Sequence, residues 1–145
     1  MIAASDPEDR VAQLIALTQN LTERLAREAA AFEARRPQDA ASGGEEIARL
    51  ANVYRHETMR IKSDPSMIAG ATKAARQRLI QVTGAFEAVL ARHGRALLAA
   101  KAVTEGLVQA IAEEVAATRS ARSPYGANAR APSADATAIT LNKRA

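Results

Sequence analysis

The fold is decided by residues 65–120, PSMIAGATKAARQRLIQVTGAFEAVLARHGRALLAAKAVTEGLVQAIAEEVAATRS. After its first residue this stretch contains no proline, and apolar residues recur at alternating intervals of three and four. This spacing places them on one face of a helix and is typical of coiled-coil packing. The face consists of Ala75, Leu79, Val82, Phe86, Val89, Ala96, Ala100, Val103, Leu107 and Ala110, widened by Leu90, Leu97, Val108, Ile111 and Val115. We therefore predict one long helix over 65–120.

Four glycines interrupt this predicted helix at positions 70, 84, 94 and 106. Each weakens a helix by up to ~1 kcal/mol without forbidding it. We predict that the helix continues past Gly94 and reaches roughly 80 Å at 1.5 Å per residue. The alternative is a break at His93-Gly94 that folds the second half back into a four-helix bundle.

A first helix is predicted over residues 7–35. Asp6 is a suitable N-cap, Pro7 suits the first helical position, and Pro37 ends the helix after Arg35 and Arg36 in its last turn. Its apolar face has the same narrow spacing, with two polar members, and comprises Val11, Leu14, Thr18, Leu21, Leu25, Glu28 and Phe32.

Residues 36–44 are predicted to form a loop, followed by a second helix over 45–62. The second helix carries its own apolar face, formed by Ile47, Leu50, Tyr54 and Ile61. Asp64 and Pro65 then favour the start of the third helix, as N-cap and first helical residue.

The predicted fold is all-α: a three-helix antiparallel hairpin or coiled-coil bundle with a long third helix and a disordered C-terminal tail. We expect a helical, chaperone-like domain over 1–122 and a flexible basic tail over 123–145. The first helix reaches only ~40 Å, so neither shorter helix can cover the whole third helix. An apolar stripe beyond that reach implies a binding partner. The predicted partner-binding residues are Leu97, Val103, Leu107, Ile111 and Val115.

Composition and motifs give no basis for catalysis, and we expect neither a cofactor nor a metal. The chain has 145 residues and no cysteine, which excludes disulfides and thiolate zinc sites. No phosphate-binding loop, nucleophile elbow or His-Glu-x-x-His pair occurs. The start is not a signal peptide and no apolar run is long enough for membrane insertion, so the cytosol is the expected location.

We predict that both histidines have structural rather than chemical roles, with one alternative for His93. His56 stands beside Arg55, which favours a solvated helix face. His93 falls in the apolar seam of the long helix, as a partly buried spacer. A phosphate-accepting histidine on a bundle is the alternative, but the residues after His93 match such domains poorly.

The tail from residue 123 changes character, being rich in Pro, Gly, Ser and Ala, and is predicted to be disordered alone. From Arg119 onward there are five basic residues against one acidic, while the part before is balanced. Such a tail is either simply solvated or touches nucleic acid or an acidic protein surface. Tyr125 is an aromatic in a segment with no core, so it is either a linker residue or an anchor for a pocket on a partner.

Three helices followed by a tail with Pro124-Tyr125-Gly126 and Leu141-Asn142 resemble the FlgN-like flagellar export chaperones. The tail is most similar to the alphaproteobacterial branch called FlbY, although this chain has Ala129 where that pattern has a second glycine. The resemblance covers the whole chain in outline and specific residues only in the tail.

The resemblance implies a type III secretion chaperone that keeps the hook-associated proteins FlgK and FlgL soluble and delivers them to the export gate. It implies that the cytoplasmic domain of that gate is contacted by the tail, through Tyr125, Gly126, Leu141 and Asn142. Three alternatives stay open: a self-associating coiled-coil scaffold, and thus a homo-oligomer; a regulatory helical bundle, including a phosphotransfer-like one; and a nucleic-acid-associated protein. Few and scattered basic residues in the tail argue against nucleic acid.

Overall fold

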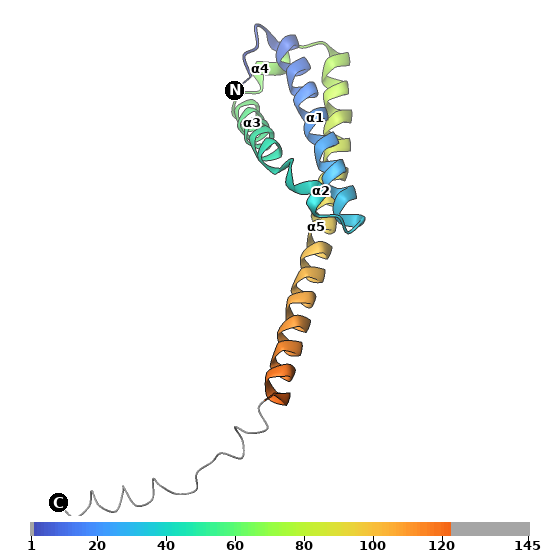
Figure 1. The fold of residues 1–145 in the computed structure, drawn as a ribbon. Helices are drawn as coiled ribbons and strands as arrows, with labels where there is room; N and C mark the ends of the chain where they lie inside the picture. The colour runs from blue at the N-terminus through green and yellow to red at the C-terminus, as the bar shows by residue number, and fades with distance from the viewer. Residues whose placement is uncertain (1, 123–145) are drawn as a thin grey trace, which may run out of the picture. The chain divides into compact units, whose positions relative to one another are not determined.

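The computed structural model describes residues 2–122, and over that range every regular element is an α-helix (Figure 1). The all-α prediction is therefore confirmed, while the tail from residue 123 lies outside the described residues. The chain divides into two compact units, Met1–Val103 and Thr104–Ala145. The helices are α1 (Pro7–Glu33), α2 (Gln38–Ala41), α3 (Gly44–Ser63), α4 (Ser66–Ala69) and α5 (Lys73–Ala121).

Helix α1 begins as its sequence predicts and ends two residues earlier. The Asp6 side chain caps it by accepting the Asp9 N–H at 2.8 Å, and Pro7 is its first residue. At the other end Arg35 adopts a left-handed backbone with φ of 58°, and the Arg36 N–H bonds back to the Ala31 carbonyl. This is a Schellman ending. The prediction that Arg35 and Arg36 form the last helical turn is wrong, because the reversal already occurs at Arg35.

The second predicted helix is confirmed as α3, with boundaries shifted by one residue at each end. The predicted loop over 36–44 is wrong in part, since its middle forms the four-residue helix α2. Ala40, in α2, is buried. Burial of Ala40 stabilises the helical conformation of this segment, although the glycines that follow it favour a loop.

The long helix starts later than predicted. Residues 66–69 form the short helix α4, the chain turns, and α5 begins at Lys73. Gly70 lies against α1 at the turn, where an added Cβ would stand 3.2 Å from the Pro7 Cγ. Thr72 caps α5 by accepting the Ala75 N–H at 3.2 Å. A single helix over 65–120 is therefore wrong at its start.

The prediction that the long helix continues past Gly94 is confirmed. Helix α5 runs for 49 residues, through His93 and Gly94, without a break. The alternative of a reversal at His93-Gly94 is therefore wrong. A Cβ added at Gly94 would meet nothing within 4 Å, so no tertiary contact demands a glycine there.

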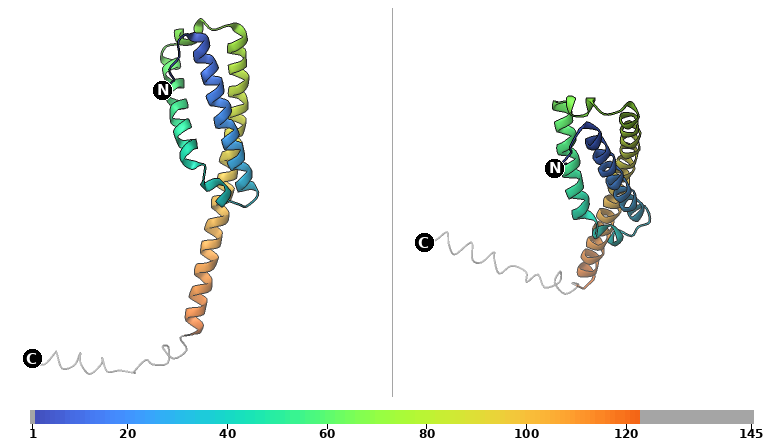
Figure 2. Two further views of the ribbon diagram at one scale, coloured as in Figure 1. Left: turned by 45° about the horizontal axis from the view of Figure 1, so that its top comes forward. Right: turned by 90° about the horizontal axis from the view of Figure 1, so that it is seen from above.

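In the first unit α1 lies beside both α3 and the initial part of α5 (Figures 1 and 2). Arg10, near the start of α1, pairs with Glu57, near the end of α3, so these two helices are antiparallel. Glu8 bonds Thr72 and Glu33 pairs with Arg92, so α1 and α5 run in the same direction. The three-helix arrangement thus contains one parallel pair.

The core of the first unit is small and lies where the three long helices meet. Leu21 and Leu25 of α1, Leu50 of α3 and Phe86 of α5 form its buried cluster. Tyr54 packs its ring on Phe86 with centroids 4.9 Å apart. Each such side chain contributes about 1.5–3 kcal/mol by burial, so these few residues account for much of the cohesion.

Candidate functional site

The five residues predicted to bind a partner all lie on α5 with exposed side chains. Leu97, Val103, Leu107, Ile111 and Val115, here called the apolar row, are 44–60% exposed. Every residue from 101 to 122 is exposed. Exposure of so many large apolar groups on one helix marks a surface that other molecules can cover.

The local sequence explains why this exposed segment is a helix. Residues 96–118 contain eight alanines and no proline, and alanine has the highest helix propensity. Gln109 adds a side-chain hydrogen bond to Glu113 at 3.1 Å, one turn later. Leu98 and Val108 are exposed beside the apolar row and widen it.

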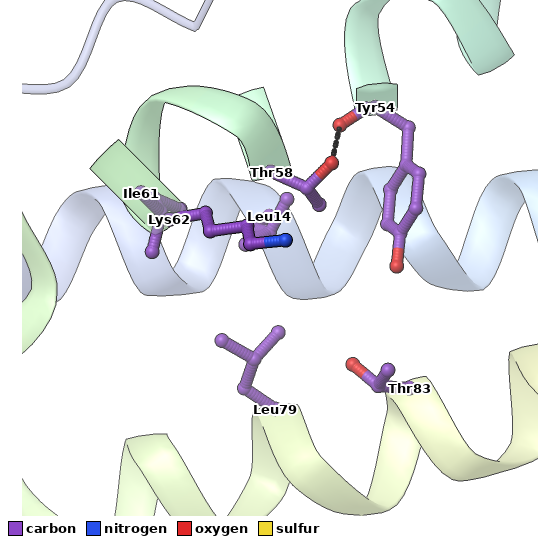
Figure 3. A pocket seen from close by; sticks show the side chains of 7 residues that line it. All are labelled: Leu14, Tyr54, Thr58, Ile61, Lys62, Leu79 and Thr83. Carbon is purple, nitrogen blue, oxygen red and sulfur yellow. Dashed lines mark hydrogen bonds between the residues drawn. The ribbon is translucent and has the colours of Figure 1, made fainter. Parts of the chain in front are cut away.

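A second apolar surface lies in the first unit, between α3 and the initial part of α5 (Figure 3). This pocket of about 250 Å³, here called the α3–α5 groove, is lined by Leu14, Tyr54, Thr58, Ile61, Lys62, Leu79 and Thr83. Figure 3 shows Leu79 and Thr83 on α5 across from Tyr54, Thr58, Ile61 and Lys62 on α3. The groove combines apolar side chains with the ammonium group of Lys62 and three hydroxyl groups, those of Tyr54, Thr58 and Thr83.

Two hydroxyl-bearing residues of α3, Tyr54 and Thr58, set the polar character of the groove. Burial raises the pKa of the Tyr54 hydroxyl, and the nearby carboxylate of Glu87 raises it further. The Thr58 hydroxyl donates to the Tyr54 carbonyl at 2.9 Å and is thereby fixed on α3. Tyr54 therefore stays protonated near neutral pH and can donate a hydrogen bond to a docked group.

Sequence reasoning missed this groove, although it named several of its residues. The sequence predicts Tyr54, Ile61 and Leu79 as members of apolar helix faces, without placing them together in a groove. In the structure they are half-buried, with their faces only partly covered by neighbouring helices. Helix periodicity reports which side of a helix is apolar and carries no information on the separation of two helices.

A buried carboxylate, also missed, ties the N-terminal segment to α3. Glu57 is fully buried, and its oxygens accept the Ile2 N–H at 3.0 Å, Arg10 at 3.0 Å and Arg60 at 3.3 Å. Burial alone would raise the pKa of Glu57, but the Ile2 N–H and the two guanidinium groups together hold it below its usual value. This cluster is structural, because its acceptor atoms are occupied by the chain's own donors.

Both histidines occupy structural environments. His56 is exposed, as predicted, with its Nδ1 3.7 Å from a Glu57 oxygen. His93 is partly buried, as predicted, with its Nε2 3.2 Å from a Glu28 oxygen and its ring centroid 6.2 Å from that of Phe32. The geometry of the Nε2–Glu28 approach falls short of a hydrogen bond. An acidic neighbour at this distance would repel an incoming phosphoryl group.

The predicted second-partner residues Tyr125, Gly126, Leu141 and Asn142 lie outside the described residues. Among residues 2–122, no group of three or more His, Asp or Glu side chains is arranged to hold a metal ion. No helix in this part of the chain is long and apolar enough to cross a membrane.

These features define an all-α protein with three long helices, one of which presents an apolar face outward. The chain belongs to the family of the flagellar basal-body protein FlbY: it is 52% identical to FlbY of Caulobacter vibrioides over 148 aligned positions, which cover 99% of both chains. The predicted relationship to FlbY is thereby confirmed, while this match does not test the FlgN-like chaperone class that the prediction also named. No protein-family model matches the chain, and no solved structure matches it.

Proposed function

We propose that this protein is a cytosolic chaperone of flagellar export. It would bind the hook-associated proteins FlgK and FlgL through the apolar row and deliver them to the type III export gate. The observation that carries this proposal is the apolar row itself, whose members are 44–60% exposed in a protein of a flagellar family. A protein that folds without covering such a row has it available for a partner.

The chemistry of the row suits helical cargo. Successive members stand four residues apart, at 103, 107, 111 and 115, and form one continuous ridge on the helix. An unfolded segment that becomes an amphipathic helix can place its own apolar face against such a ridge. Ordering the segment reduces the net affinity, so cargo can be released at the gate.

The tail supplies the second contact in this proposal. Tyr125 and Gly126, with Leu141 and Asn142, would dock on the cytoplasmic domain of the export gate. No enzymatic step is needed, because binding and release account for delivery. The proposal separates two surfaces, the apolar row for cargo and the tail for the gate, so that each can be tested with the other intact.

The double variant Leu107→Asp with Ile111→Asp tests the cargo surface. Two charges in the ridge should abolish binding of purified FlgK or FlgL, measured by titration calorimetry. The matched control is Ala102→Asp with Ala116→Asp, two exposed positions on the opposite side of the helix. Unchanged binding by the first variant, or equal losses in both, would show that the ridge is not the cargo surface.

Folding must be retained for this test to be informative. Leu107 and Ile111 are exposed, so their replacement should shift the thermal midpoint and helix content only slightly. Loss of the folded state in the Leu107→Asp, Ile111→Asp variant would mean that the ridge stabilises the chain itself, and the proposal would fail.

A further inference from the structure

The second unit exposes an apolar helix face that is bordered by one carboxylate. The members of the apolar row in this unit are Leu107, Ile111 and Val115, which are 60%, 55% and 44% exposed. Glu114 stands three residues after Ile111 and seven after Leu107, and these intervals place the three side chains on one side of an α-helix. The edge of the row therefore carries an acidic group, which is itself exposed.

The helix supplies no cation for the Glu114 carboxylate. The positions one helical turn before and after it hold Ala110, Ile111, Ala117 and Thr118. The Thr118 hydroxyl donates to the main-chain carbonyl of Glu114 at 2.9 Å, so this bond is made to the backbone and not to the carboxylate. Lys101 and Arg119 are the nearest basic residues along the chain, and their intervals from Glu114 place both on another side of the helix.

Covering the row would take water from this carboxylate. A partner that packs on Leu107 and Ile111 has Glu114 at the margin of the contact, within reach of its own side chains. A carboxylate that loses hydration and gains no cation is costly, and the cost opposes the gain from apolar contact. A lysine or arginine of the partner removes the penalty through a charge-assisted hydrogen bond.

The charges around the row favour a different molecule over a second copy. Residues 102–118 carry Glu105, Glu113 and Glu114 and no basic residue. Pairing this segment with the same segment of another copy brings acidic residues toward acidic ones and offers Glu114 no cation. Opposite charge is therefore the property that a partner has to bring.

We propose that the face formed by Leu107, Ile111, Glu114 and Val115 binds an amphipathic helix that carries a lysine or arginine beside its apolar stripe. The inference deepens the proposed function and rests on it, since the segment of FlgK or FlgL that is captured would be of this basic kind. Apolar contact supplies the buried area, while the pairing with Glu114 sets the orientation and selects against acidic helices.

The first test uses the full chain and two synthetic peptides that share one amphipathic pattern of leucines. One peptide has lysines beside the leucines, and the other has glutamates at the same places. Titration calorimetry should show that the wild type binds the lysine peptide about tenfold more tightly or better. The preference should shrink as salt is raised, because the pair at the edge of the contact is partly screened.

The second test reverses the charge at one position. Glu114→Lys should remove the preference for the lysine peptide and favour the glutamate peptide. Glu113→Lys is the matched control, because it makes the same charge change one residue away, nearly opposite Ile111 on the helix. The Glu113 carboxylate accepts from Gln109 at 3.1 Å, away from the row, so this variant should keep the preference for lysine. Leu107→Asp should bind neither peptide.

Several results would overturn the inference. They are equal binding of both peptides by the wild type, binding of neither, and the same change of preference in Glu114→Lys and Glu113→Lys. Self-association of the wild type that Leu107→Asp abolishes would assign the face to a second copy, with the same consequence. Binding of FlgK and FlgL is measured separately. Cargo binding without a peptide preference refutes this inference alone, whereas a lysine preference without cargo binding refutes the proposed function.

Discussion

Glu8 in the first turn of α1 holds Thr72, the capping residue of α5, with both carboxylate oxygens. Its Oε2 accepts the Thr72 N–H at 2.6 Å and its Oε1 accepts the hydroxyl at 3.0 Å. At the other end of the same helix pair, Glu33 accepts from Arg92 at 2.8 Å. The parallel pair of α1 and α5 is therefore fixed at both ends by polar contacts, with the apolar core between them.

The turn that precedes Thr72 contains Gly70, which lies against Pro7. Its role can be tested by comparing a substitution there with one at Gly84, where an added Cβ would contact nothing. Gly84→Ala should raise the free energy of unfolding by about 1 kcal/mol, because alanine favours helix and nothing lies within 4 Å of its Cβ. Gly70→Ala should give no such gain, since its Cβ would press on the rigid ring of Pro7. Urea unfolding measures both, and an equal gain in the two variants would contradict this account.

Arg35 occupies a backbone conformation that favours glycine. Its φ of 58° lies in the left-handed region, which costs a residue with a side chain about 1–2 kcal/mol. Arg35→Gly should therefore stabilise the fold by about 1 kcal/mol, less the greater freedom of glycine in the unfolded chain. The denaturation midpoint reports the change. Arg36→Gly, one residue on, should not stabilise, and a gain there would remove the conformational explanation.

Glu57 should be the most sensitive carboxylate among the described residues. Glu57→Ala leaves Arg10 without its buried partner and the Ile2 N–H without an acceptor, a loss of about 3 kcal/mol or more. The control is Glu45→Ala on the same helix, an exposed residue whose removal should change stability by less than about 0.5 kcal/mol. Calorimetric or chemical unfolding at neutral pH distinguishes the two.

The same carboxylate predicts acid sensitivity. The pKa of Glu57 is lower in the folded protein than in the unfolded chain, where it is near 4.3. Its contribution is therefore complete above about pH 4.3 and is lost as pH falls through the lower, folded value. Unfolding free energies measured from pH 7 downward should fall more steeply for wild type than for Glu57→Gln. Parallel curves would show that Glu57 is not the responsible group.

Tyr125 provides the test of the second surface in the proposed function. An aromatic ring buried in a partner's pocket can contribute ~2 kcal/mol or more to binding. Tyr125→Ala should leave FlgK binding and stability unchanged while reducing secretion of FlgK and swimming motility. Normal secretion by a variant with confirmed cargo binding would make Tyr125 a linker residue.

Local signals account for the parts of the fold that sequence analysis predicted. Asp6 and Pro7 act within one turn, so the start of α1 is readable from adjacent residues. The exposed apolar row was predictable for a different reason. The length of a helix follows from the number of residues in it. Because the apolar face of the long helix extends beyond the reach of the two shorter helices, part of that face must be exposed.

The features that sequence analysis missed depend on residues far apart in the chain. The start of α5 at Lys73 requires Glu8 and Pro7, more than sixty residues earlier, although a threonine three residues before Ala75 was a local cue. Burial of Glu57 requires Arg10 and Ile2, which no periodicity connects to it. The α3–α5 groove depends on the spacing between two helices, which follows from tertiary packing alone.

Tyr54, which packs on Phe86 and lines the α3–α5 groove, can report on the state of that groove through its fluorescence. The chain contains no tryptophan and two tyrosines, Tyr54 and Tyr125. In a Tyr125→Phe variant all intrinsic fluorescence would come from Tyr54, whose ring lines the groove. Anything that enters the groove changes the surroundings of that single emitter. Its occupancy could therefore be followed in dilute solution without attaching a dye.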